Sequence, residues 1–229
     1  MGLITNFLSI IIGGILGLTI GKKFNEDIKN IIVDCAGIFI MVIGIKSALV
    51  AEKDIMILIY LIIGAVIGQI IDVDKRIKDF SQFLEKKFVK ENTSGNNEKS
   101  FAKGFSTATI LYCVGAMAIL GSINSGLTND NTILNIKAIL DGVISIVLTS
   151  IYGVGVIFSA FSVFAYQGIF YLFASQIKDF LTPQAISELN AVGGVLVLAI
   201  GINMVFKKDI KTANMLPAIF IPLIVSIFS

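Results

Sequence analysis

Long apolar segments dominate the chain and alternate with short polar turns. Six predominantly apolar runs are clear, at residues 3–20, 28–50, 55–71, 105–123, 191–206 and 213–228. Since a helix rises about 1.5 Å per residue and bilayer hydrocarbon is about 30 Å thick, such runs predict membrane-spanning helices. A further stretch, residues 140–177, is too long for one span and carries Gly153 and Gly155 near its middle. We interpret it as two helices joined by a tight turn, which predicts an all-α polytopic membrane protein of about eight transmembrane helices.

Basic residues divide unevenly between the two sides of this arrangement. One side collects 14 of the 18 lysines and arginines, and the other side has only Lys46, Lys53, Lys137 and Lys178. A seven-span arrangement weakens the division to 12 against 6. Because Lys- and Arg-rich loops stay in the cytoplasm, the pattern predicts that both termini are extracytoplasmic.

Residues 72–103 form the only long polar segment. Its first part places apolar residues such as Val73, Ile77 and Phe80 on one helical face with lysines opposite, which is typical of a helix lying on a membrane surface. The tract 91–97 has linker composition. We therefore divide the chain into residues 1–71 with helices 1–3, residues 72–103 with a cytoplasmic interfacial amphipathic helix and linker, and residues 104–229 with helices 4–8.

The second predicted span recurs near the seventh. An offset of 157 residues superposes residues 37–45 on residues 194–202 with four identities and otherwise apolar pairs, so Gly37 faces Gly194 and Gly44 faces Gly201. Helices 1–3 would then recur as helices 6–8. Since equivalent helices are an odd number of spans apart, the copies would run in opposite directions. This is an inverted-topology repeat, a construction common among secondary transporters.

Glycines and prolines indicate where the predicted helices pack closely or bend. Gly13 and Gly17 lie four residues apart in the first span and offer a smooth stripe to another helix. Ordinary helix packing is the plainer interpretation of these two glycines and of those in the repeat, Gly37, Gly44, Gly194 and Gly201. In the last span, Pro217 fits the first turn with Asn214 as a cap, whereas Pro222 should kink the helix.

Several strings resemble one family of bacterial membrane proteins. They are Asn6 with Gly13-Gly14, residues 113–122, residues 126–128, Asp141-Gly142, Gln167-Gly168, residues 192–194 and residues 214–218. Together they resemble domain-of-unknown-function family 554, the YqgA/YdfK type, over almost the whole chain. The resemblance implies a multi-pass protein of the bacterial cytoplasmic (inner) membrane with a transport role, without naming a substrate. Gln69 departs from the pattern, since similar proteins are expected to have an acidic residue there.

Few ionisable or strongly polar side chains fall within the predicted spans, and such groups are usually paired, cavity-facing or functional. Asp141 opens the predicted fifth span, where it would either bind a cation or cap the helix N-terminus. Asp34 lies about two turns into the second span. Lys29 and Lys22 are within its reach, so an ion pair at the interface is the simpler interpretation.

Gln167 is the polar residue that no helix end explains, because it lies near the middle of the sixth span. It serves either a function or a hydrogen bond between helices. Asn6, Asn203 and Asn214 either cap helices or converge with Gln167 around a small polar solute. Hydroxyls such as Ser145 either line a path or bond to their own helix. We take Asn6, Asp34, Asp141, Gln167 and Asn214 as candidates for a substrate or ion path.

The composition argues against several other functions. The 229 residues contain no histidine, and Cys35 and Cys113 are isolated in separate apolar runs, so we expect no metal site, no cofactor and no catalytic residues. A net charge of +2 without basic runs interleaved with aromatics argues against nucleic acid as a partner. With 55% hydrophobic residues, the chain requires the lipid bilayer as its surroundings.

Two functional hypotheses follow. The leading one is a secondary transporter or channel for a small solute or ion, with a homo-oligomer left open. The competing one is a membrane scaffold or sensor that does not transport and acts through the cytoplasmic helix at residues 73–90.

Overall fold

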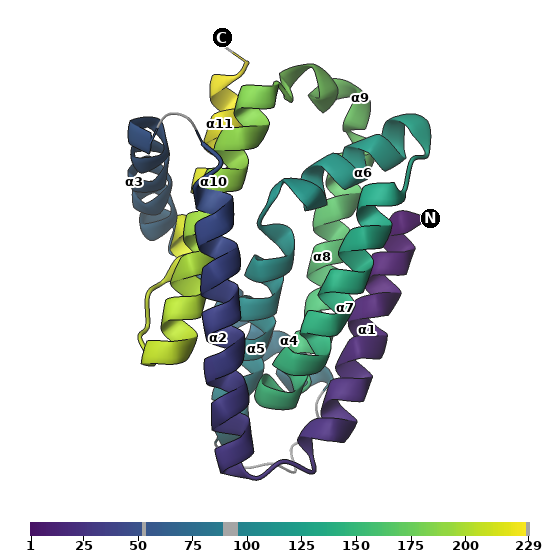
Figure 1. Cartoon of the computed structure of the whole chain (residues 1–229), viewed down its shortest axis with the longest axis vertical. Helices are drawn as coiled ribbons and strands as arrows, with labels where there is room; N and C mark the ends of the chain where they lie inside the picture. The colour runs from purple at the N-terminus through teal and green to yellow at the C-terminus, as the bar shows by residue number, and fades with distance from the viewer. Residues whose placement is uncertain (52–53, 89–95, 228–229) are drawn as a thin grey trace.

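The computed structural model describes residues 1–51, 54–88 and 96–227, and the regular structure within these ranges is helical. Six helices are long and apolar enough to cross a bilayer (Figure 1): α1 (Gly2–Gly21), α2 (Glu26–Ala48), α3 (Asp54–Ile71), α7 (Thr132–Tyr152), α8 (Gly155–Leu172) and α10 (Pro183–Phe206). The remaining elements are α4 (Val73–Phe88), α5 (Asn96–Cys113), α6 (Ala116–Thr128), α9 (Ala174–Ile177), η1 (Lys178–Phe180), η2 (Thr212–Phe220) and α11 (Ile221–Val225). The prediction of an all-α polytopic membrane protein is confirmed.

Two of the eight predicted spans are not continuous helices. The fourth is the pair α5 and α6, bent by 62° at a break. The eighth is the nine-residue 3-10 helix η2 followed by the five-residue α11. Pro217 lies inside η2 and Pro222 stands in the first turn of α11, so Pro222 starts a new helix and does not kink one continuous helix. The described residues thus contain six full-length apolar helices, or seven if the bent pair crosses as one.

The apolar stretch 140–177 is divided into two helices as predicted, but the first of them begins earlier. The division falls at Gly153, whose φ of 75° favours glycine and ends α7. α7 starts at Thr132, so Asp141 lies inside the helix and the interpretation of Asp141 as a helix cap is wrong. Lys137 also lies within α7 and not in an outer loop.

Contacts between segment ends show how the chain passes back and forth. Three hydrogen bonds join segments at one end: Gly2 to Asn131, Ser187 to Val50, and Ser226 to Phe180. At the opposite end, Gly21 packs against Ser150, and Lys103 lies over the ring of Tyr152. The first and the last described segments, at Gly2 and Ser226, therefore lie at the same end of the molecule.

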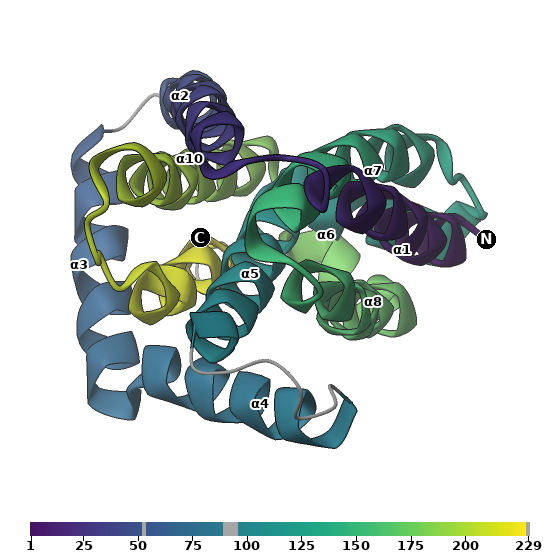
Figure 2. The same ribbon diagram turned by 90° about the horizontal axis from the view of Figure 1, so that it is seen from below.

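The helices form two lobes that lie side by side in Figure 2, and α5 is the helix of the first lobe that faces the second. The first lobe consists of α1 and α5 to α8. The second lobe consists of α2 packed on α10 and α3 packed on η2, with α11. Figure 2 shows α3 and α4 from the side, whereas α1 and α2 look shortened because they run toward the viewer.

Glycines allow the closest helix contacts in the first lobe. Gly13 faces the backbone carbonyl of Gly142 and Gly17 faces that of Ile146, so a Cβ at either glycine would collide with the α7 backbone. In both contacts the α7 residue lies the same number of positions after the α1 residue, so α1 and α7 run parallel. Direct backbone packing of this kind needs small residues.

The glycines superposed by the 157-residue offset lie where α2 and α10 meet. Gly37 contacts Gly201, and Gly44 contacts Gly194. The two helices are antiparallel, as equivalent helices of an inverted repeat must be. The repeat itself stays a prediction.

α4 is the predicted amphipathic helix, and its apolar face packs on α5. Val73 and Ile77 contact the core, and the ring of Phe80 lies 5.9 Å from that of Phe105. α5 already begins at Asn96, so the last two residues of the predicted linker tract 91–97 are helical. Residues 91–95 of that tract lie outside the described residues.

Candidate functional site

The break between α5 and α6 lies halfway along the fourth predicted span. α5 ends at Cys113, α6 begins at Ala116, and Gly115 between them has a φ of 113°, a backbone conformation that favours glycine. A helix break leaves backbone N–H groups that need new partners. Asn190 of α10 supplies one, because its Oδ1 accepts from the Ala116 backbone N–H at 3.0 Å. Gly193, one turn along α10, lies close to Gly115.

Buried polar side chains from α1, α7 and α8 gather in the same lobe. Asn6 and Gln167 are both 0% exposed, and Nδ2 of Asn6 donates to Oε1 of Gln167 at 3.3 Å. On α7, Lys137 and Asp141 form an ion pair one helical turn apart, with each side chain only 7% exposed. Asn6 also interacts with the Asp141 carboxylate. The structure therefore brings together three of the five candidate residues.

The C-terminal end of α5 joins this group. The hydroxyls of Tyr112 and Ser145 are 2.7 Å apart, and Nζ of Lys137 lies 5.8 Å from the centre of the Tyr112 ring. Tyr112 directly precedes Cys113, the last residue before the break. We call the following six residues the polar cluster: Asn6, Tyr112, Lys137, Asp141, Ser145 and Gln167.

The polar cluster has hydrogen-bonding groups that no described residue satisfies. Oδ1 of Asn6 and Nε2 of Gln167 are buried without a partner in the part of the chain that the structure describes. The amide pair thus presents one free acceptor and one free donor. Leaving such a group unpaired costs about 1–3 kcal/mol, so a molecule that offers both a donor and an acceptor would complete the pair.

Two of the glycines close in sequence to members of the polar cluster have open space beside them. No heavy atom outside the immediate chain lies within 4 Å of the position that a Cβ on Gly115 or on Gly168 would take. Gly115 stands at the helix break and Gly168 directly follows Gln167. The backbone is therefore accessible at both places.

Asn214 does not converge with Gln167. Its Nδ2 donates to Oε1 of Gln69 at 2.9 Å, and its Oδ1 accepts from the Asp74 backbone N–H at 2.7 Å. Asn214 therefore caps the start of α4, and the prediction that it caps the last helix is wrong. Gln69, which replaces the acidic residue expected in similar proteins, takes part in the contact between α3 and η2.

Asp34 is half-buried on α2 and also stays outside the polar cluster. Lys29 pairs with Glu26 at 2.9 Å and not with Asp34. Among the described residues, no ion pair involves Asp34. Asn203 bonds the backbone of Ile210 through both its oxygen and its nitrogen, which closes the turn after α10.

Four polar residues of these contacts are not predicted from the sequence, namely Tyr112, Lys137, Glu188 and Asn190. Lys137 was assigned to a loop, although its spacing of four residues from Asp141 is the spacing of a helical ion pair. Asn190 and Glu188 gave no local signal. Glu188 is 5% exposed and accepts from the Tyr60 hydroxyl at 3.1 Å and from Nε2 of Gln184 at 2.8 Å.

These features define a multi-pass α-helical membrane protein with a buried polar centre beside a broken helix. The family described as "Protein of unknown function (DUF554)" matches residues 1–227, and the chain belongs to this family. It is 34% identical over 228 residues to "Uncharacterized membrane protein YdfK" of Bacillus subtilis (strain 168), covering 98% of this chain and 94% of that protein. It is 25% identical over 221 residues to "Uncharacterized protein YqgA" of Escherichia coli (strain K12), covering 96% and 94%. No solved structure matches the chain.

Proposed function

We propose that the protein is a secondary transporter or channel that moves a small polar solute or ion across the bacterial cytoplasmic membrane by way of the polar cluster. The observation that carries this proposal is the buried amide pair of Asn6 and Gln167, which keeps one acceptor and one donor without a partner. In a membrane protein, strongly polar groups buried among the helices are costly and are typically retained for function.

The helix break beside the cluster supports the same function. Discontinuous helices near the bilayer midplane form the solute sites of many secondary transporters, because their backbone ends supply hydrogen-bonding groups. Here the break is held by Asn190 and lies next to Tyr112 of the cluster. The contacts of α2 with α10 at repeated glycines are consistent with the inverted repeat that such transporters often have.

The ion pair adds charge of both signs to the site. Burying Lys137 and Asp141 together costs desolvation energy that a pair of apolar residues would avoid, so its presence favours a role beyond stability. A charged or zwitterionic solute would form an ion pair with Lys137 or Asp141 and so replace the other residue of the pair. A small polar solute or an ion is therefore the substrate class we propose.

The orientation we propose places both termini outside the cytoplasm and α4 on its cytoplasmic surface. Lys137 lies inside α7 and no longer counts as a loop residue. Among the described residues, Lys46 and Lys178 are then the basic residues at the end where Gly2 and Ser226 lie. The opposite end has the lysines around α4 and those after α1 and α10. Since Lys137 no longer counts as a loop residue, the excess of basic residues at the opposite end is larger than in the division of 14 against 4, and the positive-inside rule favours this orientation.

The test measures flux in proteoliposomes for a panel of alkali cations, amino acids, sugars and carboxylates. Gln167→Leu should abolish flux of the transported compound while leaving the unfolding temperature close to that of the parent protein, since leucine has a similar size. Gln69→Leu is the matched control, because it makes the same chemical change in the second lobe. Absence of flux for the whole panel, or normal flux in Gln167→Leu at normal stability, would contradict the proposal.

A further inference from the structure

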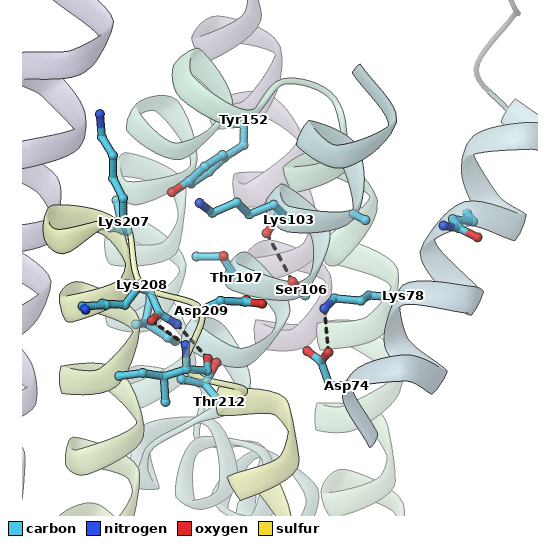
Figure 3. A pocket seen from close by; sticks show the side chains of 16 residues that line it. Asp74, Lys78, Lys103, Ser106, Thr107, Tyr152, Lys207, Lys208, Asp209 and Thr212 are labelled. Atoms are coloured by element: carbon cyan, nitrogen blue, oxygen red, sulfur yellow. Dashed lines mark hydrogen bonds and ion pairs between the residues drawn. The ribbon is translucent and has the colours of Figure 1, made fainter. Parts of the chain in front are cut away.

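A pocket of about 650 Å³ opens at the end of the molecule opposite Gly2 and Ser226 (Figure 3). Its walls come from α4, α5, the end of α7, the end of α10 and the turn that leads into η2. The charged residues of the lining are Lys78, Lys103, Lys207, Lys208, Asp74 and Asp209. Four lysines and two aspartates leave a net charge of +2 on the walls. We call it the basic pocket.

The negative charges in the basic pocket gather around one lysine. Asp74 pairs with Lys78 at 2.6 Å, and Asp209 interacts with the same ammonium group. The hydrogen bond that Lys78 donates to the Asp74 carboxylate raises the pKa of Lys78 above its ordinary value. Figure 3 shows this pair on one side of the pocket and Lys207 and Lys208 on the other.

Three lysines remain for a ligand. Within the described part of the chain, no carboxylate forms an ion pair with Lys103, Lys207 or Lys208. Nζ of Lys103 lies 5.7 Å from the centre of the Tyr152 ring, which orients this ammonium group within the pocket. Excess positive charge in a concave site attracts and retains anions.

Hydroxyl donors lie among these lysines. Thr107 is one helical turn after Lys103 on α5, and both line the pocket together with Tyr152. Figure 3 shows the Lys103 ammonium group and the Tyr152 hydroxyl directed into the pocket from adjacent walls. Ammonium and hydroxyl groups together suit an anion with several acceptor oxygens, which describes a phosphate group better than a halide.

We propose that the basic pocket binds a phosphate-bearing anion, held by Lys103, Lys207 and Lys208 and by the hydroxyls of Thr107 and Tyr152. The volume exceeds that of a lone ion and accommodates a phosphate with its substituents. Two sources supply this chemistry. Anionic phospholipid headgroups bind basic pockets at the cytoplasmic membrane surface, and soluble phosphate compounds reach the same face from the water. The site is separate from the polar cluster and does not depend on transport.

The experiment compares two double variants of the full-length protein in a neutral maltoside detergent. The pocket variant is Lys103→Gln with Lys207→Asn, because asparagine tolerates the positive φ of 51° at residue 207. The control is Lys22→Gln with Lys23→Gln, which removes the same charge at the same end but outside the pocket. Each protein is titrated with phosphatidylglycerol, with phosphatidylcholine as a neutral reference, and with inorganic pyrophosphate, and the unfolding temperature is recorded.

At least one phosphate probe should raise the unfolding temperature of the parent and of the control by several degrees, and the pocket variant should lose most of that shift. A response to phosphatidylglycerol alone identifies a lipid headgroup as the ligand. A response to pyrophosphate identifies a soluble phosphate compound, and a response to both identifies phosphate as the shared determinant. If the pocket variant does not fold, the single change Lys207→Asn replaces it. No response to either probe, or an equal loss in the control, would overturn the proposal.

Discussion

Both lobes bury polar side chains, and they differ in how completely those side chains are hydrogen-bonded. In the second lobe, both oxygens of Glu188 accept hydrogen bonds, and Asn214 uses both its oxygen and its nitrogen. In the first lobe, five buried side-chain atoms lack a partner among the described residues, on Asn6, Thr109, Thr149, Tyr166 and Gln167. Satisfied polar groups need no further explanation, whereas unsatisfied ones indicate a place for water or a solute.

Each lobe also has one discontinuous helical segment, and the causes differ. In the second lobe, Pro217 and Pro222 impose the change from η2 to α11. In the first lobe, no proline is present at the break, and Gly115 together with Asn190 of the other lobe holds it. The first break is thus a tertiary feature, and we expect it to change when the lobes move relative to one another.

Removing one member of the buried ion pair should have the largest effect. Asp141→Leu leaves Lys137 as an uncompensated charge and should destabilise the protein by about 3–5 kcal/mol. Combining it with Lys137→Met should restore most of that stability but not the flux, as denaturant unfolding and proteoliposome assays would show. A double variant that transports normally would remove the pair from the site.

Packing in the second lobe should be the next most sensitive feature. A side chain at Gly44 would collide with the α10 backbone at Gly194 and Leu198, so Gly44→Leu should cost about 1–3 kcal/mol or more. Ile45→Leu, at a half-exposed neighbouring position, is the control and should be close to neutral. Flux per folded molecule should survive, and its selective loss would show that the second lobe is more than a scaffold.

The link across the lobes should have an intermediate effect. Asn190→Ala leaves the Ala116 backbone N–H without its acceptor and should cost about 1–3 kcal/mol. Hydrogen exchange should accelerate at residues 114–118. Asn203→Ala removes an amide that bonds the backbone at an exposed turn, so it serves as a control and should leave this segment unchanged. Equal exchange at the break in all three proteins would contradict the role of Asn190.

The smallest effect should come from Glu188→Gln. Glutamine still offers an oxygen to the Tyr60 hydroxyl, and the amide of Gln184 can turn to accept from the new nitrogen, so we expect a loss below about 1 kcal/mol. Flux should be unchanged when measured alongside the unfolding temperature. A large loss of flux at normal stability would place the site in the second lobe.

Hydropathy predicts most helices of this fold because lipid-facing and core-facing residues are both apolar. It places the start of α7 too late, since Asn135 and Lys137 interrupt the apolar pattern and only the tertiary pairing of Lys137 with Asp141 makes them compatible with the interior. It also misses the break after Cys113. The residues there are apolar and small, and the acceptor that holds the break comes from residue 190.

The candidate site could be predicted only in part for the same reason. Asn6, Asp141 and Gln167 stand out as polar residues in apolar surroundings, and the structure brings them together. Asp34 and Asn214 show the same local pattern but lie elsewhere. Polarity within a span identifies a buried group, whereas its partners are set by packing between distant segments.

Water access to Cys113 tests the central claim most directly. This thiol is 8% exposed at the end of α5, beside Tyr112 of the polar cluster. With Cys35 replaced by alanine, a small water-soluble methanethiosulfonate reagent is added to the protein in proteoliposomes, and modification is quantified by mass spectrometry. If the first lobe opens to water during transport, Cys113 is modified and flux falls in parallel. A thiol that reacts only after unfolding, in protein that transports at full rate, would contradict a path through the first lobe.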